Sequence, residues 1–327
     1  MENTDLRKIQ EMGGGTALIS LPKSWVKRNN LKKGSVVSIE STSDRLIISP
    51  HSSEQREPKE ITLAYPPKHL HSLLNEITAA YLLGYDMIRI VGKDRVSYSD
   101  RNTIKNTMKF LMGLEIVEED AYTITIQFLL EPSNIHPDKL FMRMHAITSG
   151  MHKDLLTACM ENNAKLLKDV RGRDDEVDRL YFLLVRIIRS AVQDPTLAAK
   201  FGMGPIDCLD YRVAANFLEA IGDASARAAD FPESKLHFSE KDENLLSKLG
   251  SMLGEIQNSA VRALLTKKAS EARRVLELHA ELTESMTRVG GEKNASFVAE
   301  LLSAMNTVAR LCVDIADLAV PLYPTVR

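Results

Sequence analysis

The sequence predicts a mainly α-helical protein in which a small β-rich unit and a small α/β unit precede two tandem three-helix bundles. Three observations carry this fold class. From Asp138 onward, apolar residues recur every three or four positions over long segments, as in amphipathic helices. Between Ile61 and Phe128, strand-like and helix-like segments alternate. Before Pro50, short alternating segments are separated by glycines. At 327 residues the chain has room for several cores.

Composition excludes several classes of protein. The formal net charge is −2, so any affinity for nucleic acid must come from a local basic patch. No apolar run approaches the roughly 20 residues of a membrane span, and the segment MENTDLRKIQ lacks an apolar signal region. Cys159, Cys208 and Cys312 are odd in number, widely spaced and set in helical apolar patterns, which indicates buried thiols. We expect a soluble, cytoplasmic protein.

The first predicted domain, residues 1–51, is built from short strands. Strands are expected at residues 6–9 and 16–21, with a turn at Gly13–Gly15 between them. Pro22 precedes a short helix from Lys23 to Asn30, and segments 35–41 and 45–49 form a closing hairpin. About fifty residues with so few apolar side chains cannot bury a sufficient core alone. We therefore expect this domain to dimerise.

Basic residues dominate this domain between residues 7 and 33. Seven basic side chains stand against one acidic side chain, Glu11. Such a local excess is what a phosphate-binding face of a DNA-binding protein needs. The predicted DNA-binding residues are Arg7, Lys8, Lys23, Lys27, Arg28, Lys32 and Lys33. The alternative is a dimerisation module whose lysines only keep it in solution.

The pattern RKIQEMGGGTALISLPKSWVKRNNLKKGSVVSIESTSDRLIISP resembles the AbrB-like swapped-hairpin family, also called SpoVT/AbrB. The resemblance implies that two copies interleave into one small barrel and that basic residues on its N-terminal side contact double-stranded DNA. Members of that family commonly have one or two glycines in the first turn, whereas this chain has three, Gly13–Gly15. The geometry of that loop is the point at which this chain departs from the family.

A polar linker, residues 51–59, leads to a second predicted domain, residues 59–131. Its order is β-α-β-α-β-β, which is typical of a small open α/β sandwich. Ser99 is expected to cap the second helix, which extends to about Met112. No phosphate-binding loop is present, and we expect the domain to act as a spacer or to add dimer contacts. The strands are expected at 61–65, 87–91, 114–118 and 122–128, and the first helix at 70–81.

The remaining chain is predicted to form two three-helix bundles, residues 136–232 and 238–324. A loop is expected between the second and third helices, from Asp194 to Pro205. The two bundles look like an internal repeat, because CMENNAKLLKDV aligns with LLTKKASEARRV and FLEAIGDASARAAD with RLCVDIADLAV. The helices are expected at 138–161, 164–192, 206–230, 240–265, 270–288 and 295–322.

Two acidic pairs in the first bundle form a candidate metal site. Asp174 and Asp178 are four residues apart, as are Glu219 and Asp223, so each pair shares one face of a helix. Like charges at this spacing repel each other unless a cation lies between them. Two neighbouring helices that present such pairs could hold a hard metal ion. The alternative interpretation is a solvated acidic edge.

The sequence DDEVDRL, followed about forty residues later by FLEAIGDASARAAD, resembles the PhoU family of phosphate-uptake regulators over residues 135–323. The resemblance implies two three-helix bundles in tandem, whose Glu/Asp-x-x-x-Asp motifs bind iron or zinc clusters; magnesium is a further candidate. The second bundle has lost much of the acidic pattern. A weaker site there could use Glu277 and Glu281 with Asp314 and Asp317.

No enzymatic motif is evident. Gly-x-Ser-x-Gly, His-Glu-x-x-His and the phosphate-loop motif are missing, as are the Glu-x-x-His pairs of di-iron carboxylate bundles. His145 and His152 are seven residues apart and could share a face with the acidic cluster, or they are hydrogen-bonded helix histidines. We predict that the protein is not an enzyme.

The combination of domains resembles a fused form of PhoU with an AbrB-type head that is found chiefly in archaea. The resemblance implies a transcriptional regulator of phosphate uptake, a homodimer or higher even oligomer, whose bundles sense phosphate status or contact a phosphate ABC transporter. One alternative is a transporter gate whose head only dimerises. Another is a metal-storage or redox enzyme on a helical scaffold.

Overall fold

The computed structural model describes residues 6–41, 46–50, 58–230, 238–289 and 295–319. The chain divides into two compact units, Met1–Glu57 and Pro58–Arg327, and each is described by itself. Most of the predicted linker, residues 51–57, lies outside the described residues. Among the described helices, none combines the length and apolar character needed to cross a membrane.

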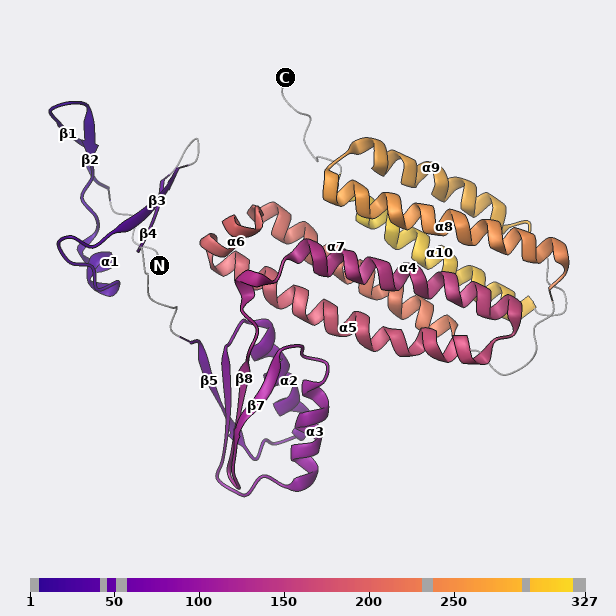
Figure 1. The fold of residues 1–327 in the computed structure, drawn as a ribbon, viewed down its shortest axis with the longest axis horizontal. Helices are drawn as coiled ribbons and strands as arrows, with labels where there is room; N and C mark the ends of the chain where they lie inside the picture. Colours follow the sequence, from indigo (N-terminus) through magenta and orange to yellow (C-terminus); the bar gives the residue numbers. More distant parts are fainter. Residues whose placement is uncertain (1–5, 42–45, 51–57, 231–237, 290–294, 320–327) are drawn as a thin grey trace. The chain divides into compact units, whose positions relative to one another are not determined.

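The first unit consists of two antiparallel hairpins and a short helix (Figure 1). Gly14 and Gly15 have φ angles of 97° and 83°, which glycine adopts most readily, and they form the first turn. The predicted strand at residues 6–9 is wrong: the first described strand begins at Gln10, which is paired with Leu18, the last residue of its partner strand. The elements are β1 (Gln10–Met12), β2 (Thr16–Leu18), α1 (Lys23–Arg28), β3 (Val37–Ser41) and β4 (Leu46–Pro50).

No described residue of this first unit is buried. Many of its apolar side chains are exposed instead; Leu6 is 93% exposed, Ile9 70% and Leu46 63%. A unit of this size needs apolar burial from outside itself to be stable.

The second unit begins with the predicted β-α-β-α-β-β order. Its sheet has the strand order β5-β6-β8-β7, in which β5 is parallel to β6 and the other pairs are antiparallel. Apolar residues of the two helices and of one sheet face form a common core. The elements are β5 (Glu60–Tyr65), α2 (Leu70–Leu82), β6 (Met87–Gly92), α3 (Tyr98–Met108), β7 (Leu114–Glu119) and β8 (Thr123–Phe128).

The cap of α3 differs from the prediction. Ser97, not Ser99, is the N-cap: its hydroxyl accepts a hydrogen bond from the backbone N–H of Asp100 at 3.1 Å. The helix ends at Met108 rather than near Met112. Two serines two residues apart offer similar capping chemistry, and the placement of the helix against the sheet selects between them.

The helical part contains both predicted bundles. In the first, α4, α5 and α7 pack together; in the second, α8, α9 and α10 do so. The two bundles contact each other through α4 with α8 and α7 with α10, and their buried residues form one continuous core (Figure 1). After a single 3₁₀ turn at Pro132–Asn134, the helices are α4 (Pro137–Glu161), α5 (Ala164–Gln193), α6 (Pro195–Phe201), α7 (Pro205–Ala228), α8 (Glu240–Thr266), α9 (Ala269–Met286) and α10 (Ala295–Asp317).

The predicted loop between Asp194 and Pro205 contains the helix α6. Asp194 caps it by accepting hydrogen bonds from the backbone N–H groups of Thr196 and Leu197. Leu197 is buried against the bundle core. The helix is only two turns long, so its periodicity is too short to recognise from spacing. The three cysteines are free and buried, as predicted.

Helix α5 belongs to two cores at once. Leu180, Leu184 and Ile188 face the bundle core, whereas Leu183 and Ile187 pack into the core of the α/β part. The intervening Arg186 is also buried, and its contacts are made with the α/β part. Because one helix is shared between the cores, the α/β part packs directly against the first bundle.

Candidate metal centre

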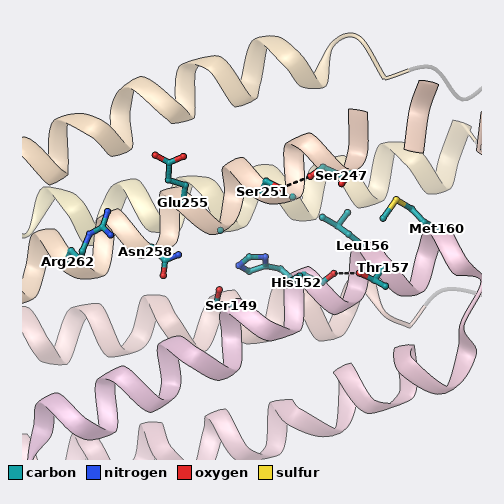
Figure 2. A pocket seen from close by; sticks show the side chains of 13 residues that line it. Ser149, His152, Leu156, Thr157, Met160, Ser247, Ser251, Glu255, Asn258 and Arg262 are labelled. Atoms are coloured by element: carbon teal, nitrogen blue, oxygen red, sulfur yellow. Dashed lines mark hydrogen bonds between the residues drawn. The ribbon is translucent and has the colours of Figure 1, made fainter. Parts of the chain in front are cut away.

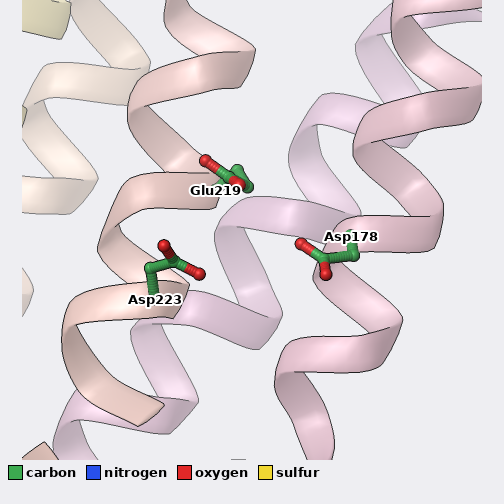
Figure 3. Close-up of side chains that lie close together, drawn as sticks. All are labelled: Asp178, Glu219 and Asp223. Carbon is green, nitrogen blue, oxygen red and sulfur yellow. The ribbon is translucent and has the colours of Figure 1, made fainter. Parts of the chain in front are cut away.

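Three carboxylates converge between α5 and α7. One oxygen atom from each of Asp178, Glu219 and Asp223 lies within 4.8 Å of the others. Figure 3 shows Asp178 on α5 facing Glu219 and Asp223, which lie one turn apart on α7. Three of the four predicted ligands are therefore brought together, from two helices that are neighbours in space but about forty residues apart in sequence.

A glycine allows the two helices to approach at this point. A Cβ atom added to Gly222 would lie 3.1 Å from Oδ1 of Asp174 and 3.3 Å from Cγ1 of Val177. Both contacts are tight, so any larger residue would crowd the side chains of Asp174 and Val177 on α5. Sequence reasoning did not identify Gly222; its one available signal was a glycine inside a helix, where the residue is unfavourable unless packing requires it.

The fourth predicted ligand, Asp174, lies one helical turn before Asp178 at the edge of the cluster. Its Oδ1 atom is buried and has no hydrogen-bond partner in the described part of the chain. An unsatisfied buried carboxylate oxygen is costly, unless a cation or a proton compensates it. This oxygen is therefore a group that a metal ion would satisfy.

The electrostatics of the cluster are those of crowded carboxylates. Burial and then the neighbouring carboxylates raise the pKa of Glu219 to about 7 and that of Asp174 to about 6. The pKa of Asp178 is raised by the same causes. Arg227, whose guanidinium lies 3.5 Å from Asp223, opposes these shifts in Glu219 and Asp174. A cluster that retains protons near neutral pH has a deficit of positive charge.

The donor set fits a metal ion. Carboxylate oxygens are the ligands of hard cations, and they also serve iron and zinc. Asp178, Glu219 and Asp223 can supply one oxygen each, and the unsatisfied Oδ1 of Asp174 lies beside them. The arrangement can hold positive charge between two helices and thereby hold the helices together.

No comparable cluster is found elsewhere in the described residues. In the second bundle, the carboxylate of Glu281 lies 3.4 Å from Lys248, and that of Glu277 lies 3.9 Å from Arg274. The weaker site predicted from Glu277, Glu281, Asp314 and Asp317 is therefore replaced in part by surface ion pairs.

The helix histidines do not face the acidic cluster. Nε2 of His145 lies 3.0 Å from Oδ1 of Asn258, and Nε2 of His152 lies 2.7 Å from Oε1 of Gln257. Both partners are on α8, on the opposite side of the first bundle's core from an α5–α7 site. Of the two interpretations of these residues, hydrogen-bonded helix histidines is the one observed.

The seven basic residues between Arg7 and Lys33 are all exposed. Lys27 and Arg28 occupy the last turn of α1, and Lys23 its first turn. Lys32 and Lys33 follow the helix, and Arg7 and Lys8 precede β1. The chain thus presents these side chains to solvent, where they can meet a phosphate backbone.

These features define a protein with a small basic β unit and a PhoU-like pattern of acidic pairs in a helical bundle. Comparison with known families agrees: residues 141–231 match the PhoU domain, and residues 12–56 match MazE, the antidote-toxin recognition family of bacterial antitoxins. The chain therefore carries a PhoU domain in its first bundle and a MazE/AbrB-like domain at its N-terminal end.

The crystal structure of PhoU from Pseudomonas aeruginosa is similar over 56% of this chain and 93% of that chain, with 11% sequence identity and a TM-score of 0.42. No curated protein matches the sequence. The four predicted metal ligands all lie inside the stretch that matches the PhoU domain.

Proposed function

We propose that this protein is a DNA-binding regulator of phosphate uptake, in which the N-terminal unit binds DNA and the helical unit responds to phosphate status. The observation that carries the proposal is the joining, in one chain, of a MazE/AbrB-like domain and a PhoU domain. The seven exposed basic side chains between Arg7 and Lys33 support it, because charge of this kind supplies most of the affinity for a phosphate backbone.

The DNA-binding form would be a homodimer or a higher even oligomer. The first unit has no buried described residue, and it exposes a series of apolar side chains. A second copy of the same unit would cover these side chains and double the number of basic residues on one particle. It would also offer strand partners to residues 6–9.

A metal ion is part of the proposal. Asp178, Glu219 and Asp223 would hold it, and Asp174 would add a further oxygen. Iron or zinc is proposed first, with magnesium as a third choice, and the ion would supply the positive charge that the carboxylates lack. Arg227 would then remain as a partner for Asp223.

The second candidate function is a gate of a phosphate ABC transporter in which the first unit only dimerises. The PhoU domain alone supports that role as well as it supports gene regulation. The two candidates differ in whether the basic residues meet DNA, so a DNA-binding measurement separates them. A redox or storage enzyme is less well supported, because neither helix of the cluster supplies a histidine ligand to it.

The decisive experiment is fluorescence anisotropy of the full-length protein with its own promoter, a phosphate-transporter promoter and scrambled duplexes, across a salt series. Each phosphate contact lowers log affinity by about 0.9 per unit of log salt. If half of the dimer's basic side chains contact phosphate, the slope is roughly −6.

Two variants separate specific from non-specific contacts. We expect Arg7→Ala to weaken binding to the preferred promoter more than to scrambled DNA, because arginine can read guanine bidentately. Lys27→Ala should weaken both alike, as the loss of a phosphate contact does. A flat salt dependence, or no binding to either promoter at low salt, would favour the transporter-gate function.

A further inference from the structure

A cavity of about 510 Å³ lies where the two bundles meet, between α4 and α8 (Figure 2). It is separate from the acidic cluster, which lies between α5 and α7. The α8 side is a row of small or polar residues that includes Ser247, Ser251 and Asn258, and the α4 side includes His152 and Lys153. Its volume is in the range of pockets that hold small organic ligands.

The floor of the cavity contains a glycine that helix packing does not explain. A Cβ atom on Gly254 would meet nothing within 4 Å, although Gly254 lies in the middle of α8. Gly250, one turn earlier, is different, because its Cβ would lie 2.6 Å from Cδ1 of Leu156. Glycine inside a helix is unfavourable relative to alanine. At position 254 close packing does not explain why a glycine is present.

A buried imidazole lines the same cavity and has one unsatisfied nitrogen. His152 is 3% exposed, and its Nδ1 atom has no hydrogen-bond partner among the described residues. The amide of Gln257 donates to the hydroxyl of Thr148 at 2.7 Å, so its oxygen faces Nε2 of His152 and accepts a hydrogen bond from it. In a neutral ring Nδ1 is then an acceptor. This nitrogen is buried as well as unpartnered, so the open space of the cavity does not reach it.

The charges around the cavity leave one cation available. Glu255 accepts from Arg274 at 2.9 Å, and Arg262 donates to Glu271 at 3.1 Å. Lys153, at the edge of the cavity, is exposed and has no ion-pair partner among the described residues. The remaining polar groups are serine and threonine hydroxyls and the amide of Asn258. This lining suits a ligand with one anionic group and several hydroxyl groups.

We infer that the cavity between α4 and α8 binds a small phosphate-bearing molecule with hydroxyl groups, of the size of a sugar phosphate or a nucleoside monophosphate. Lys153 binds the phosphate group, the serine and threonine hydroxyls that line the cavity bond to hydroxyl groups of the ligand, and the body of the ligand occupies the space above Gly254. Because α4 belongs to the first bundle and α8 to the second, the ligand contacts both bundles. The inference needs neither the metal nor DNA, so its test is independent of the proposed function.

Isothermal titration calorimetry with the full-length protein tests this inference. The probes are ribose 5-phosphate and adenosine 5′-monophosphate, with ribose, adenosine and inorganic phosphate as comparisons. We expect at least one of the two phosphate-bearing probes to bind at least about tenfold more tightly than its unphosphorylated counterpart and than inorganic phosphate.

Three variants locate the site. Gly254→Leu fills the cavity and should weaken the preferred probe at least about tenfold. Gly172→Leu is its matched control, because Gly172 is also a helical glycine with nothing within 4 Å of its added Cβ, and it should bind as the wild type does. Lys153→Ala, an exposed change that does not threaten folding, should weaken the phosphate-bearing probes and leave their counterparts unchanged. The inference is overturned if neither phosphate-bearing probe binds at millimolar concentration, or if binding is unaffected by both Gly254→Leu and Lys153→Ala.

Discussion

Glu219 and Asp223 form with Asp178 a cluster of crowded carboxylates, and burial together with the neighbouring negative charges raises the pKa of Glu219. Replacing both residues of the α7 pair by alanine should abolish bound metal in elemental analysis. In metal-free protein the same change should raise the midpoint of thermal unfolding, because it removes repulsion. The matched control is the double change Glu277→Ala and Glu281→Ala, a pair at the same spacing whose members lie near Arg274 and Lys248.

The control should leave the metal content unchanged. Equal metal content in the Glu219→Ala, Asp223→Ala variant and the wild type would rule out this cluster as the binding site. A lower unfolding midpoint for this variant than for the wild type, both without metal, would show that repulsion among the carboxylates does not destabilise the fold.

His152 makes the free energy of unfolding depend on pH. Burial lowers its pKa from 6.5 to about 4. A depressed histidine pKa stabilises the fold above pH 6.5, and this contribution is lost as the pH falls toward 4. The full effect is about 3 kcal/mol, since each pKa unit corresponds to about 1.4 kcal/mol.

The measurement is urea unfolding of the wild type and His152→Gln between pH 7 and pH 4.5. The difference in their free energies of unfolding should shrink as the pH falls, because the imidazole takes up a proton in the unfolded wild type but stays neutral in the folded one. Titration of the acidic cluster is common to both proteins and cancels in this difference. A difference that stays constant with pH would mean that His152 is not held neutral.

At the scale of elements, α5 joins the α/β part to the first bundle. Its Arg186 is 1% exposed, donates to the backbone oxygen of Tyr81 at 2.6 Å and lies 3.7 Å above the ring centre of Phe128. Asp86 lies 3.6 Å from the same guanidinium. One side chain of a bundle helix therefore satisfies polar and aromatic groups on the α/β part.

We expect Arg186→Ala to lower the free energy of unfolding by about 3 kcal/mol, as for other buried charges whose network is broken. Arg189→Ala is the control on the same helix, because Arg189 is exposed, and it should change stability by less than about 0.5 kcal/mol. Urea unfolding measures both. Similar small losses for the two variants would show that Arg186 does not hold the two parts together.

At the scale of the whole molecule, the chain consists of one unit with its own core and one without. Residues 58–327 bury an extensive apolar core, whereas no described residue of the first unit is buried. Stability of the first unit therefore depends on association. We expect a fragment that ends at Ser52 to be an obligate dimer in size-exclusion chromatography with light scattering.

A folded, monomeric fragment at micromolar concentration would contradict this expectation. The complementary fragment, residues 58–327, serves as the control, and it should fold and retain bound metal while losing DNA binding. We expect only the larger fragment to fold as a monomer, because it buries an apolar core and the first unit does not. Burial of apolar surface is the main favourable term in folding.

The sequence by itself determined the classes of element and the candidate ligands. The helical period of apolar residues located the six long helices, and the four-residue spacing of carboxylates placed each pair on one helix face. Both signals are local, because residues three or four positions apart are neighbours in any helix. The two domain resemblances were also readable from short motifs, and the family matches agree with them.

The tertiary structure alone decided which faces meet. It placed α6 where spacing predicted a loop, selected Ser97 as the cap of α3, and brought Asp178 within reach of α7 through Gly222. It also turned His145 and His152 toward α8 and opened the cavity above Gly254. These outcomes depend on how closely two helices that are distant in sequence pack against each other. The spacing between them is fixed by the side chains of both helices together. The local pattern of one segment does not contain that information.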